Sequence, residues 1–445
     1  MTRRKFFLGS AAAFALPPYA AFAAAPDLRT IARDGYLYVL PLLEMAATRT
    51  RLLANGASQN TVYSRRNLAD ASSRSVTSPN NDTLYSVAWL DLTAGPVTAS
   101  LPDVGQRYVS LQLMDMYTNN FAVLGTRTTG SAPAKFTIVG PNDAIAASDR
   151  NVLRSPTPHV WALARVLVDG PDDLDAARAA QAGILIDGPK VAAQPRNASV
   201  AAVMQDATWR DVFAEANRLL AEERPPVTDL AMLRRIAPLG VGPDATFNPD
   251  AFSDSEREAI AAGVADGRAL VTDPRNRGQA VQGWYYPGPT LGIWGQDYGA
   301  RAVVARTGLA ALPRDEAMYM RPEGTDGNAL YDGRKMWRIH FAPGQLPPVS
   351  GFWSLTMYER TADGQSFFTE NTLKRYAIGN RTPGLKTNDD GTLDIWIGHD
   401  DPGPERQANW LPAPAGSFTM TLRAYLPARS LLNGDYKLPP MTPAG

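Results

Sequence analysis

The chain has 445 residues, with 44 Lys and Arg against 44 Asp and Glu, three His and no Cys. This length allows two or three domains with buried cores, and the lack of Cys excludes disulfides, thiolate metal sites and a cysteine nucleophile. Because the charges balance, the sequence lacks the basic excess of a general nucleic-acid binder, and no nucleic-acid partner is expected. The 36 Gly and 36 Pro indicate many turns, as is typical of β-rich chains.

The N-terminus has the pattern of an export signal. The pair Arg3-Arg4 precedes an apolar run that reaches Ala25, an arrangement typical of twin-arginine signals. Ala21-Phe22-Ala23 fits the small-residue rule for cleavage after its last residue. A membrane anchor needs about 20 apolar residues, and Pro17-Pro18 interrupt a shorter run. We therefore expect residues 1–23 to be a cleaved signal peptide of the twin-arginine type, a periplasmic location and no stable membrane insertion after cleavage.

The first predicted element is a helix within residues 26–70, where apolar side chains recur at spacings of three and four. From about residue 75 to 168, short apolar runs alternate with Pro, Gly, Asn and Asp, which predicts strands joined by turns. The clearest of these strands cover residues 84–90, 108–114, 135–139 and 159–168. Residues 26–168 are therefore predicted to form a helical lead-in followed by a first β-sandwich domain.

The middle of the chain, residues 169–310, predicts a mainly helical connecting region. One apolar face runs along residues 209–223, and Ser253 with Glu256 has the pattern of a helix-capping box. Residues 311–445 predict a C-terminal β-sandwich domain, with strands at 335–341, 351–359, 393–398 and 417–426. The last of these alternates apolar and polar residues, as in a strand with one buried face. The fold class that follows is α+β and β-rich, with two β-sandwich or jelly-roll-like domains joined by a helical segment.

Two polar clusters at predicted strand ends are candidates for a functional site. The first contains Asn81 and Asp82 just before a strand, where an Asx turn is the alternative to hydrogen bonding and acid–base chemistry. The second follows the strand 108–114 and combines a carboxylate, a phenol and two amides: Asp115, Tyr117, Asn119 and Asn120. If the fold brings Asp82 and Asp115 within reach, they can act as acid and base, with Tyr117 as a proton donor.

A third cluster concentrates five aromatic residues within residues 284–298. Trp294 and Tyr298 would suit a sugar or an apolar ring, and Arg301 would suit an anionic group because a guanidinium binds carboxylate through two hydrogen bonds. The alternative is that these aromatic side chains pack a domain junction, since Trp and Tyr bury large areas.

Metal and nucleotide cofactors are not indicated. The three His, at positions 159, 340 and 399, are scattered and form no zinc motif. Neither a G-x-S-x-G nucleophile motif nor a glycine-rich phosphate loop occurs. Asp389-Asp390-Gly391, before the strand 393–398, predicts a hairpin turn rather than a calcium loop. We therefore expect neither a metal nor a cofactor.

Several strings in the sequence also carry a family resemblance. In the N-terminal half they are residues 78–85 (SPNNDTLY), 115–120 (DMYTNN) and 139–141 (VGP). In the C-terminal half they are Tyr298 with Arg301-Ala302, residues 347–358 (PPVSGFWSLTMY) and residues 409–414 (NWLPAP). Over about residues 30–440 the chain resembles exported bacterial proteins that pair domain of unknown function 1254 with domain of unknown function 1214. The resemblance implies β-sandwich modules with helical insertions, and it transfers no catalytic roles because the family has no established shared reaction.

Two hypotheses about function follow. The first is an exported, cofactor-independent hydrolase or lyase that acts on a carbohydrate-like or carboxylated small molecule, with Asp82, Asp115 and Tyr117 as catalytic residues. The substrate-binding residues would be Asn81, Asn119, Asn120, Trp294, Tyr298, Arg301 and Tyr358, the last of which lies in the resembling string 347–358. The alternative is a periplasmic ligand-binding or envelope-associated protein without catalysis. A homo-oligomer is compatible with either hypothesis.

Overall fold

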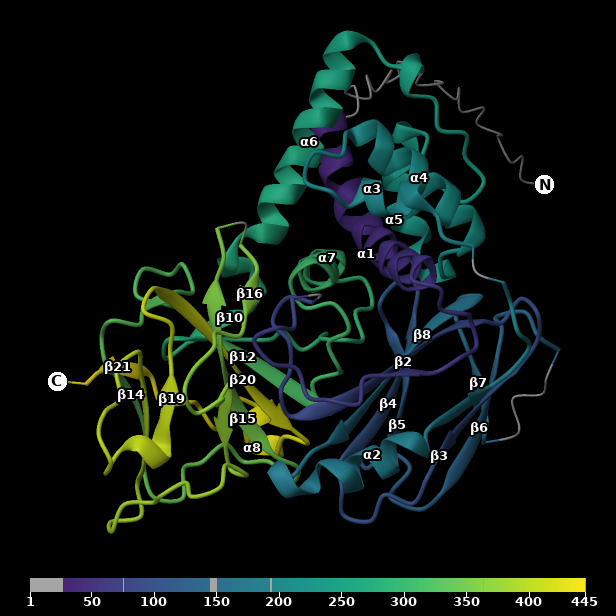
Figure 1. Ribbon diagram of the computed structural model, residues 1–445. Coiled ribbons are helices and arrows are strands. Elements are labelled where there is room, and N and C mark those ends of the chain that lie inside the picture. The colour runs from purple at the N-terminus through teal and green to yellow at the C-terminus, as the bar shows by residue number, and fades with distance from the viewer. Residues whose placement is uncertain (1–26, 75, 145–149, 193, 363, 445) are drawn as a thin grey trace, which may run out of the picture.

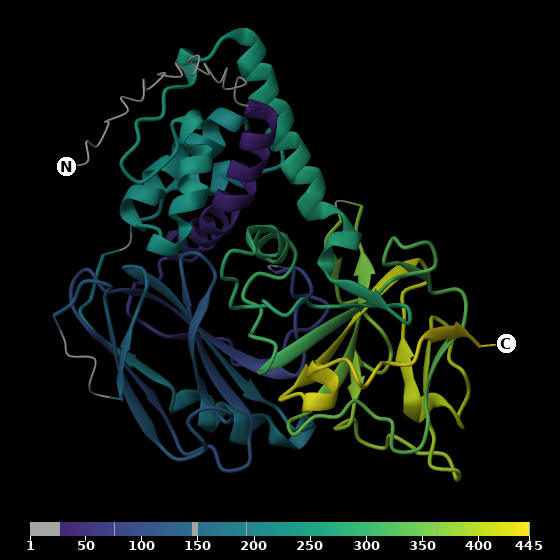
Figure 2. The same ribbon diagram turned by 180° about the vertical axis from the view of Figure 1, so that it is seen from behind.

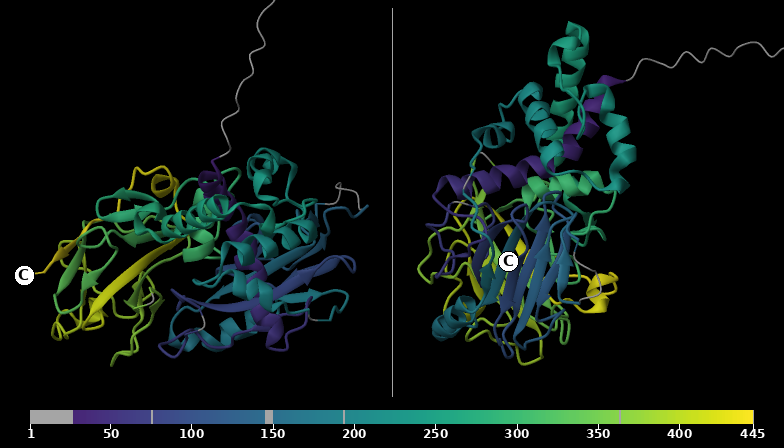
Figure 3. Two further views of the ribbon diagram at one scale, coloured as in Figure 1. Left: turned by 90° about the horizontal axis from the view of Figure 1, so that it is seen from above. Right: turned by 90° about the vertical axis from the view of Figure 1, so that its right-hand side faces the viewer.

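Two β-sandwiches lie side by side beneath a layer of helices (Figure 1; Figure 3). The computed structural model describes residues 27–444 except 75, 145–149, 193 and 363. The predicted signal peptide, residues 1–23, therefore lies outside the described residues. Helices combine with mainly antiparallel sheets, which confirms the predicted α+β class. Within the described part of the chain, no helix has the length and apolar character needed to span a membrane.

The first sandwich packs a five-stranded sheet, ordered β1-β2-β8-β4-β5, against a four-stranded sheet, ordered β7-β6-β3-β9. The strands are β1 (Tyr63–Ser64), β2 (Thr83–Asp91), β3 (Val97–Leu101), β4 (Val109–Asp115), β5 (Asn120–Gly125), β6 (Ala134–Val139), β7 (Val152–Arg154), β8 (His159–Leu167) and β9 (Leu185–Asp187). Alternate apolar residues of β8, including Val160 and Val166, enter the core between the two sheets. Helix α2 (Leu174–Ala182) contacts β2 and β8 at the edge of this sandwich.

The second sandwich pairs a large sheet, with the strand order β10-β11-β12-β20-β15-β16, with a smaller sheet ordered β19-β18-β14-β21. The large sheet contains β10 (Gln279–Val281), β11 (Trp284–Tyr286), β12 (Ala317–Pro322), β13 (Tyr331–Asp332), β15 (Trp353–Arg360), β16 (Ser366–Phe367), β17 (Ala377–Gly379) and β20 (Ser417–Tyr425). The smaller sheet contains β14 (Trp337–Phe341), β18 (Leu393–Gly398), β19 (Trp410–Pro412) and β21 (Met441–Pro443). A short helix, α8 (Arg429–Leu432), follows β20.

Both faces of β20 are buried, although its sequence predicts one exposed face. Met420 and Leu422 enter the apolar core between the two sheets. Thr421 and Arg423, on the opposite face, are also buried. The N-terminal half of the chain lies against that face, where Arg423 donates a hydrogen bond to the carbonyl of Ser78. The polar residues of this strand therefore belong to the junction between the two sandwiches.

The helical layer unites the start of the described chain with its middle. Helix α1 (Leu28–Ala54) is enclosed by helices from much later in the sequence (Figure 2). These are α3 (Asn197–Ala202), α4 (Trp209–Glu222), α5 (Leu230–Ile236), α6 (Asp254–Thr272) and α7 (Tyr298–Thr307). Gly263 allows α6 to approach α1 closely, since a Cβ at this position would lie 2.1 Å from the carbonyl oxygen of Arg29. Ser253 and Glu256 form the predicted capping box of α6.

Candidate functional site

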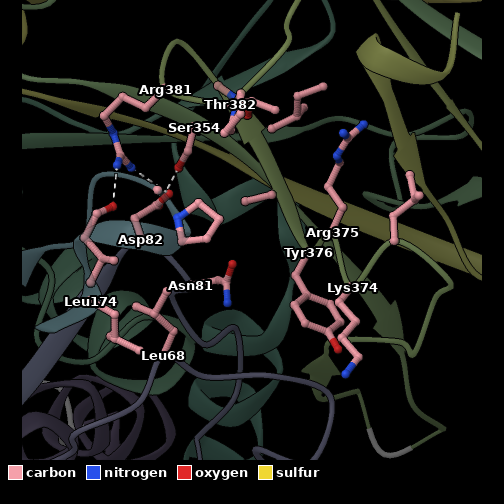
Figure 4. Close-up of a pocket in the computed structure, with 18 of the residues that line it drawn as sticks. Leu68, Asn81, Asp82, Leu174, Ser354, Lys374, Arg375, Tyr376, Arg381 and Thr382 are labelled. Atoms are coloured by element: carbon pink, nitrogen blue, oxygen red, sulfur yellow. Dashed lines mark hydrogen bonds and ion pairs between the residues drawn. The ribbon is translucent and has the colours of Figure 1, made fainter.

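A cleft of about 420 Å³ opens where the first sandwich meets the second (Figure 4). The first sandwich contributes the residues before β2 and the segment that leads from β8 into α2. The second contributes the end of β15 that carries Ser354 and the segment 373–383 around β17. Apolar side chains form much of the wall: Leu68, Val168, Leu174, Trp353, Leu373 and Ile378. The rest of the wall is polar, and a pocket between two modules is a common place for a small-molecule site.

Asp82 is the centre of a polar contact between the two modules. The Oγ of Ser354 donates a hydrogen bond of 2.6 Å to its carboxylate, and a guanidinium nitrogen of Arg381 lies 3.3 Å from the other carboxylate oxygen. Arg381 also donates to the carbonyl of Val168 at 2.6 Å and stacks over the ring of Phe352 at 4.4 Å. The carboxylate of Asp82 is thereby paired with a cation and buried, so it resembles a structural anchor more than a free general base.

The remaining polar groups give the cleft an excess of positive charge. Lys374, Arg375 and Arg381 line it, against a single carboxylate, that of Asp82. Lys374 is exposed. Arg375 donates hydrogen bonds to three backbone carbonyls, and burial lowers the pKa of its guanidinium. Asn81 lies on the wall beside Asp82 (Figure 4) and donates to a backbone carbonyl at 2.5 Å. The arrangement favours an anionic ligand.

Asp82 and Asp115 lie at opposite ends of the same sheet. The residue after Asp82, Thr83, is paired with Leu167 of β8, whereas Asp115 is paired with Val160. Seven residues of β8 separate these levels, which corresponds to roughly 20 Å at about 3.3 Å per residue. The condition for an acid–base pair is therefore not met, and the prediction that Asp82 and Asp115 act together is wrong. The reason is that β2 and β4 run in the same direction on either side of β8. Asp82 precedes β2 and Asp115 ends β4, so the two residues lie at opposite ends of the sheet.

Asp115 closes a tight turn between β4 and β5. Its Oδ1 accepts hydrogen bonds of 2.9 Å from the backbone N–H groups of both Tyr117 and Asn119. Burial raises the pKa of Asp115 to about 6, although the hydrogen bonds from Asn119 act in the opposite direction. The phenol of Tyr117 is buried and donates to the carbonyl of Glu223. Each of these polar groups thus has a partner within the protein, and neither Asp115 nor Tyr117 lines the cleft.

The amides that follow Asp115 hold the segment before α7 against the first sheet. Asn119 accepts a hydrogen bond from the backbone N–H of Trp294, whose indole donates to the carbonyl of Thr118 at 2.9 Å. Asn120 donates to the carbonyl of Gly292 at 2.9 Å. Trp294 is buried. The structure therefore gives Asn119, Asn120 and Trp294 partners within the protein, away from the cleft.

Arg301 is held inside a group of aromatic rings. Its guanidinium lies 4.9 Å from the ring centre of Tyr298 and 5.2 Å from that of Tyr38, and it is 3.9 Å from the carboxylate of Asp229. The phenol of Tyr298 donates to the same carboxylate at 2.9 Å. Arg301 is 1% exposed, so no ligand reaches it in this conformation. Tyr358 is likewise buried and donates to the carbonyl of Pro79 at 2.6 Å.

One cluster has the composition of a metal site. His159, Glu222 and Glu223 each place a ligand atom within 4.8 Å of the others, as found among the described residues. Arg49 already supplies a cation there, 2.8 Å from Nε2 of His159 and 3.4 Å from Glu222. Burial acts to lower the pKa of His159, but the carboxylates of Asp91 and Glu223 raise it to about 9. We assign the cluster to an ion-pair network that joins the first sheet to α4.

Sequence reasoning placed two residues in the cleft, Asn81 and Asp82, and missed most of its wall. Ser354 lies within the string 347–358, where the sequence indicated only a strand over residues 351–359. Arg381 follows β17 in a loop without a recognisable motif. Each contacts Asp82 from nearly 300 residues away in the sequence. No local pattern marks such a contact.

Comparisons with known families agree with this architecture. Residues 59–188 match a family described as a protein of unknown function (DUF1254), and residues 316–429 match a second one, DUF1214. The chain carries a DUF1254 module followed by a DUF1214 module. The DUF1254 match covers most of the first sandwich, the DUF1214 match covers most of the second, and the cleft lies between the two modules.

A solved structure shares the whole fold. The VPA0106 protein from Vibrio parahaemolyticus is similar over 94% of this chain and 100% of its own, with a TM-score of 0.67 and 23% sequence identity. An uncharacterized protein from Burkholderia cenocepacia is similar over 89% of this chain and 85% of its own, with a TM-score of 0.44 and 14% identity. We find no significant match among curated proteins. The first likeness shows that both modules and the helical layer recur together in another protein.

Proposed function

We propose that the cleft between the DUF1254 and DUF1214 modules binds a small carboxylated molecule with an apolar part. The observation that carries the proposal is the combination of three cationic residues, Lys374, Arg375 and Arg381, with a wall that is partly polar and partly apolar, in a space of about 420 Å³. The cations suit the carboxylate, and the apolar side chains suit the rest of the ligand.

Binding is better supported than catalysis. A hydrolase or lyase needs a base that is free to take a proton. Asp82, the only predicted catalytic residue in the cleft, is engaged by Arg381 and Ser354. Asp115 and Tyr117 lie at the far end of the sheet. We therefore favour the ligand-binding alternative over the hydrolase or lyase.

We also propose that the protein acts in the periplasm after cleavage of residues 1–23. The support is the pattern of a basic pair, an apolar run and Ala21-Phe22-Ala23. A protein exported in this way would meet small carboxylated molecules outside the cytoplasm. The ligand-binding role and the location are thus consistent with each other.

The test is a comparison of carboxylates with their uncharged amides. Benzoate and hexanoate are titrated into the purified protein by calorimetry, alongside benzamide and hexanamide. Lys374→Ala should weaken carboxylate binding by about tenfold, the effect of losing one charged hydrogen bond. Lys335→Ala is the matched control, because Lys335 is exposed and lies outside the cleft. Equal affinity for acids and amides, or equal effects of the two lysine variants, would contradict the proposal.

A further inference from the structure

A second group of cations lies deeper in the junction, where the large sheets of the two modules face each other. In the first module, Arg165 of β8 is paired in register with Tyr85 of β2, and its guanidinium is 5.4 Å from the centre of that ring. In the second module, Arg423 of β20 is paired with Tyr319 of β12. Each guanidinium interacts electrostatically with a phenol of the other module, Arg165 with Tyr319 and Arg423 with Tyr85. The four side chains therefore share one region.

Neither guanidinium forms a close ion pair, although the carboxylate of Asp82 attracts Arg423 at longer range. Arg165 is 4% exposed and donates to the side-chain oxygen of Gln112 at 2.8 Å and to the carbonyl of Ala310 at 2.9 Å. The partners of Arg423, which is 5% exposed, are likewise neutral oxygens, those of Thr356, Tyr358 and Ser78. In the part of the chain that the structure describes, no carboxylate oxygen lies within 4.0 Å of either guanidinium.

Another buried arginine, Arg301, does have such a partner. Its guanidinium lies 3.9 Å from the carboxylate of Asp229. A buried charge without a counter-charge is costly, commonly by several kcal/mol. Two buried cations that contact only neutral groups therefore point to an anion that the protein itself does not provide.

The phenols around these cations have protons to donate. The phenol oxygens of Tyr85 and Tyr425 accept hydrogen bonds from the side-chain amide of Asn80, at 3.3 and 2.9 Å. The oxygen of Tyr319 accepts from the backbone N–H of Leu312 at 3.4 Å. Tyr85 and Tyr319 are also only half-buried, although each lies on a strand with neighbours on both sides. Part of each tyrosine is therefore accessible to solvent.

The electrostatics of the region are those of an anion site. Burial acts to raise the pKa of Tyr85, but Arg165 and Arg423 outweigh it and lower the pKa of that phenol. Arg321, two residues beyond Tyr319 on the same face of β12, adds a third cation. Burial together with neighbouring cations, including Arg423, lowers the pKa of Arg321 to about 10. Arg321 donates a hydrogen bond of 3.0 Å to the backbone carbonyl of Thr307.

We propose that Arg165 and Arg423, with the phenols of Tyr85 and Tyr319, bind a small oxyanion of the phosphate or carboxylate type between the two modules. The DUF1254 module supplies Arg165 and Tyr85, and the DUF1214 module supplies Arg423 and Tyr319. Guanidinium groups and phenol O–H groups are strong donors to such oxygens. None of these four residues lines the cleft described above, although Arg423 is paired in register with Ser354, which does. An anion held there would connect the modules electrostatically.

The experiment compares anions at constant ionic strength. The full-length mature protein, in a Hepes and potassium chloride buffer, is titrated with inorganic phosphate and separately with acetate, and binding is followed by calorimetry and by thermal unfolding. We expect saturable binding and a rise in Tm with at least one of them, and none with added chloride. The anion that binds more tightly distinguishes a phosphate from a carboxylate ligand. Failure of both to bind would overturn the proposal.

Two variants test the assignment. Tyr319→Phe removes one hydroxyl and should weaken anion binding by about tenfold while leaving the Tm in Hepes unchanged. Arg165→Met should abolish the anion response, and it should also lower the Tm in Hepes because Gln112 and Ala310 lose their hydrogen bonds from the guanidinium. If that variant does not fold, Tyr319→Phe still decides. Normal anion affinity in Tyr319→Phe would overturn the assignment.

The variant Lys374→Ala tests whether the anion binds at this site or in the cleft. An absorbance spectrum tests whether a tyrosine phenolate, instead of a bound anion, neutralises the arginines. Lys374→Ala should keep the anion response of the wild type, whereas Tyr319→Phe should keep benzoate binding in the cleft. Loss of the anion response in Lys374→Ala would place the anion in the cleft and refute a second site. A tyrosinate absorbance band at neutral pH that disappears in Tyr85→Phe would identify the phenolate as the counter-charge, and it would also refute the proposal.

Discussion

The substitution Asp115→Asn should remove a dependence of stability on pH. Burial raises the pKa of Asp115 from the ordinary 3.8 to about 6 in the folded protein. A raised carboxyl pKa favours folding most below pH 3.8, and this contribution is lost as the pH rises through about 6. The difference between the two pKa values corresponds to about 3 kcal/mol. Asn stays neutral at every pH and still offers an oxygen to the backbone N–H groups of Tyr117 and Asn119.

The assay is urea unfolding of the wild type and the variant at pH 4 and pH 8. The free energy of unfolding of the wild type, relative to Asp115→Asn, should fall by about 2–3 kcal/mol between these values. Asp115→Ala is the control, since it also lacks the titrating group but leaves two backbone N–H groups without an acceptor, which costs about 1–3 kcal/mol for each at both pH values. A wild-type advantage over Asp115→Asn that is constant, or that grows with pH, would refute the reasoning.

Three further outcomes follow from packing and from the signal pattern. Gly263→Ala should destabilise the protein by about 2 kcal/mol or more in a thermal unfolding assay, because the added Cβ would collide with the carbonyl of Arg29. Gly299→Ala is the control and should cost little, since the space around Gly299 is open. Trp294→Phe should lower the free energy of unfolding in urea by about 1–2 kcal/mol, since a buried indole hydrogen bond is lost; an unchanged midpoint would contradict this. N-terminal sequencing of the exported protein should begin near Ala24, and an intact Met1 would argue against cleavage.

Local patterns in the sequence predicted single elements well. The strand at Leu393–Gly398 and the capping box at Ser253 are both confirmed, because each depends on neighbouring residues only. The turn at Asp389-Asp390-Gly391 also forms, closed by a hydrogen bond from Asn388 N–H to the carbonyl of Thr392. It does not join a hairpin, however, since β18 is paired with β14, some fifty residues earlier. Pairing depends on the whole sheet, and a turn sequence cannot specify it.

The candidate site was likewise predictable only where it depends on neighbouring residues in the sequence. Asn81 and Asp82 were predicted as site residues because they are polar and precede a strand, and they line the cleft. Asp115 has the same local character, yet it lies at the opposite end of the sheet. The difference arises because one residue precedes its strand and the other ends it. The partner of Asp82 in the other module, Arg381, depends on how two separately built sandwiches meet, which no short segment encodes.

The enclosure of α1 by later helices has a consequence for the timing of folding. α1 is the first helix after the predicted signal peptide, and α7, whose Arg306 pairs with the buried Glu44 of α1, ends only at Thr307. Contacts between residues so far apart in sequence form late, because a long loop must close first. The ribosome must therefore complete the first sandwich and the middle of the chain before α1 can be covered. Until then, the apolar surface of α1 lacks the helices that cover it in the folded protein.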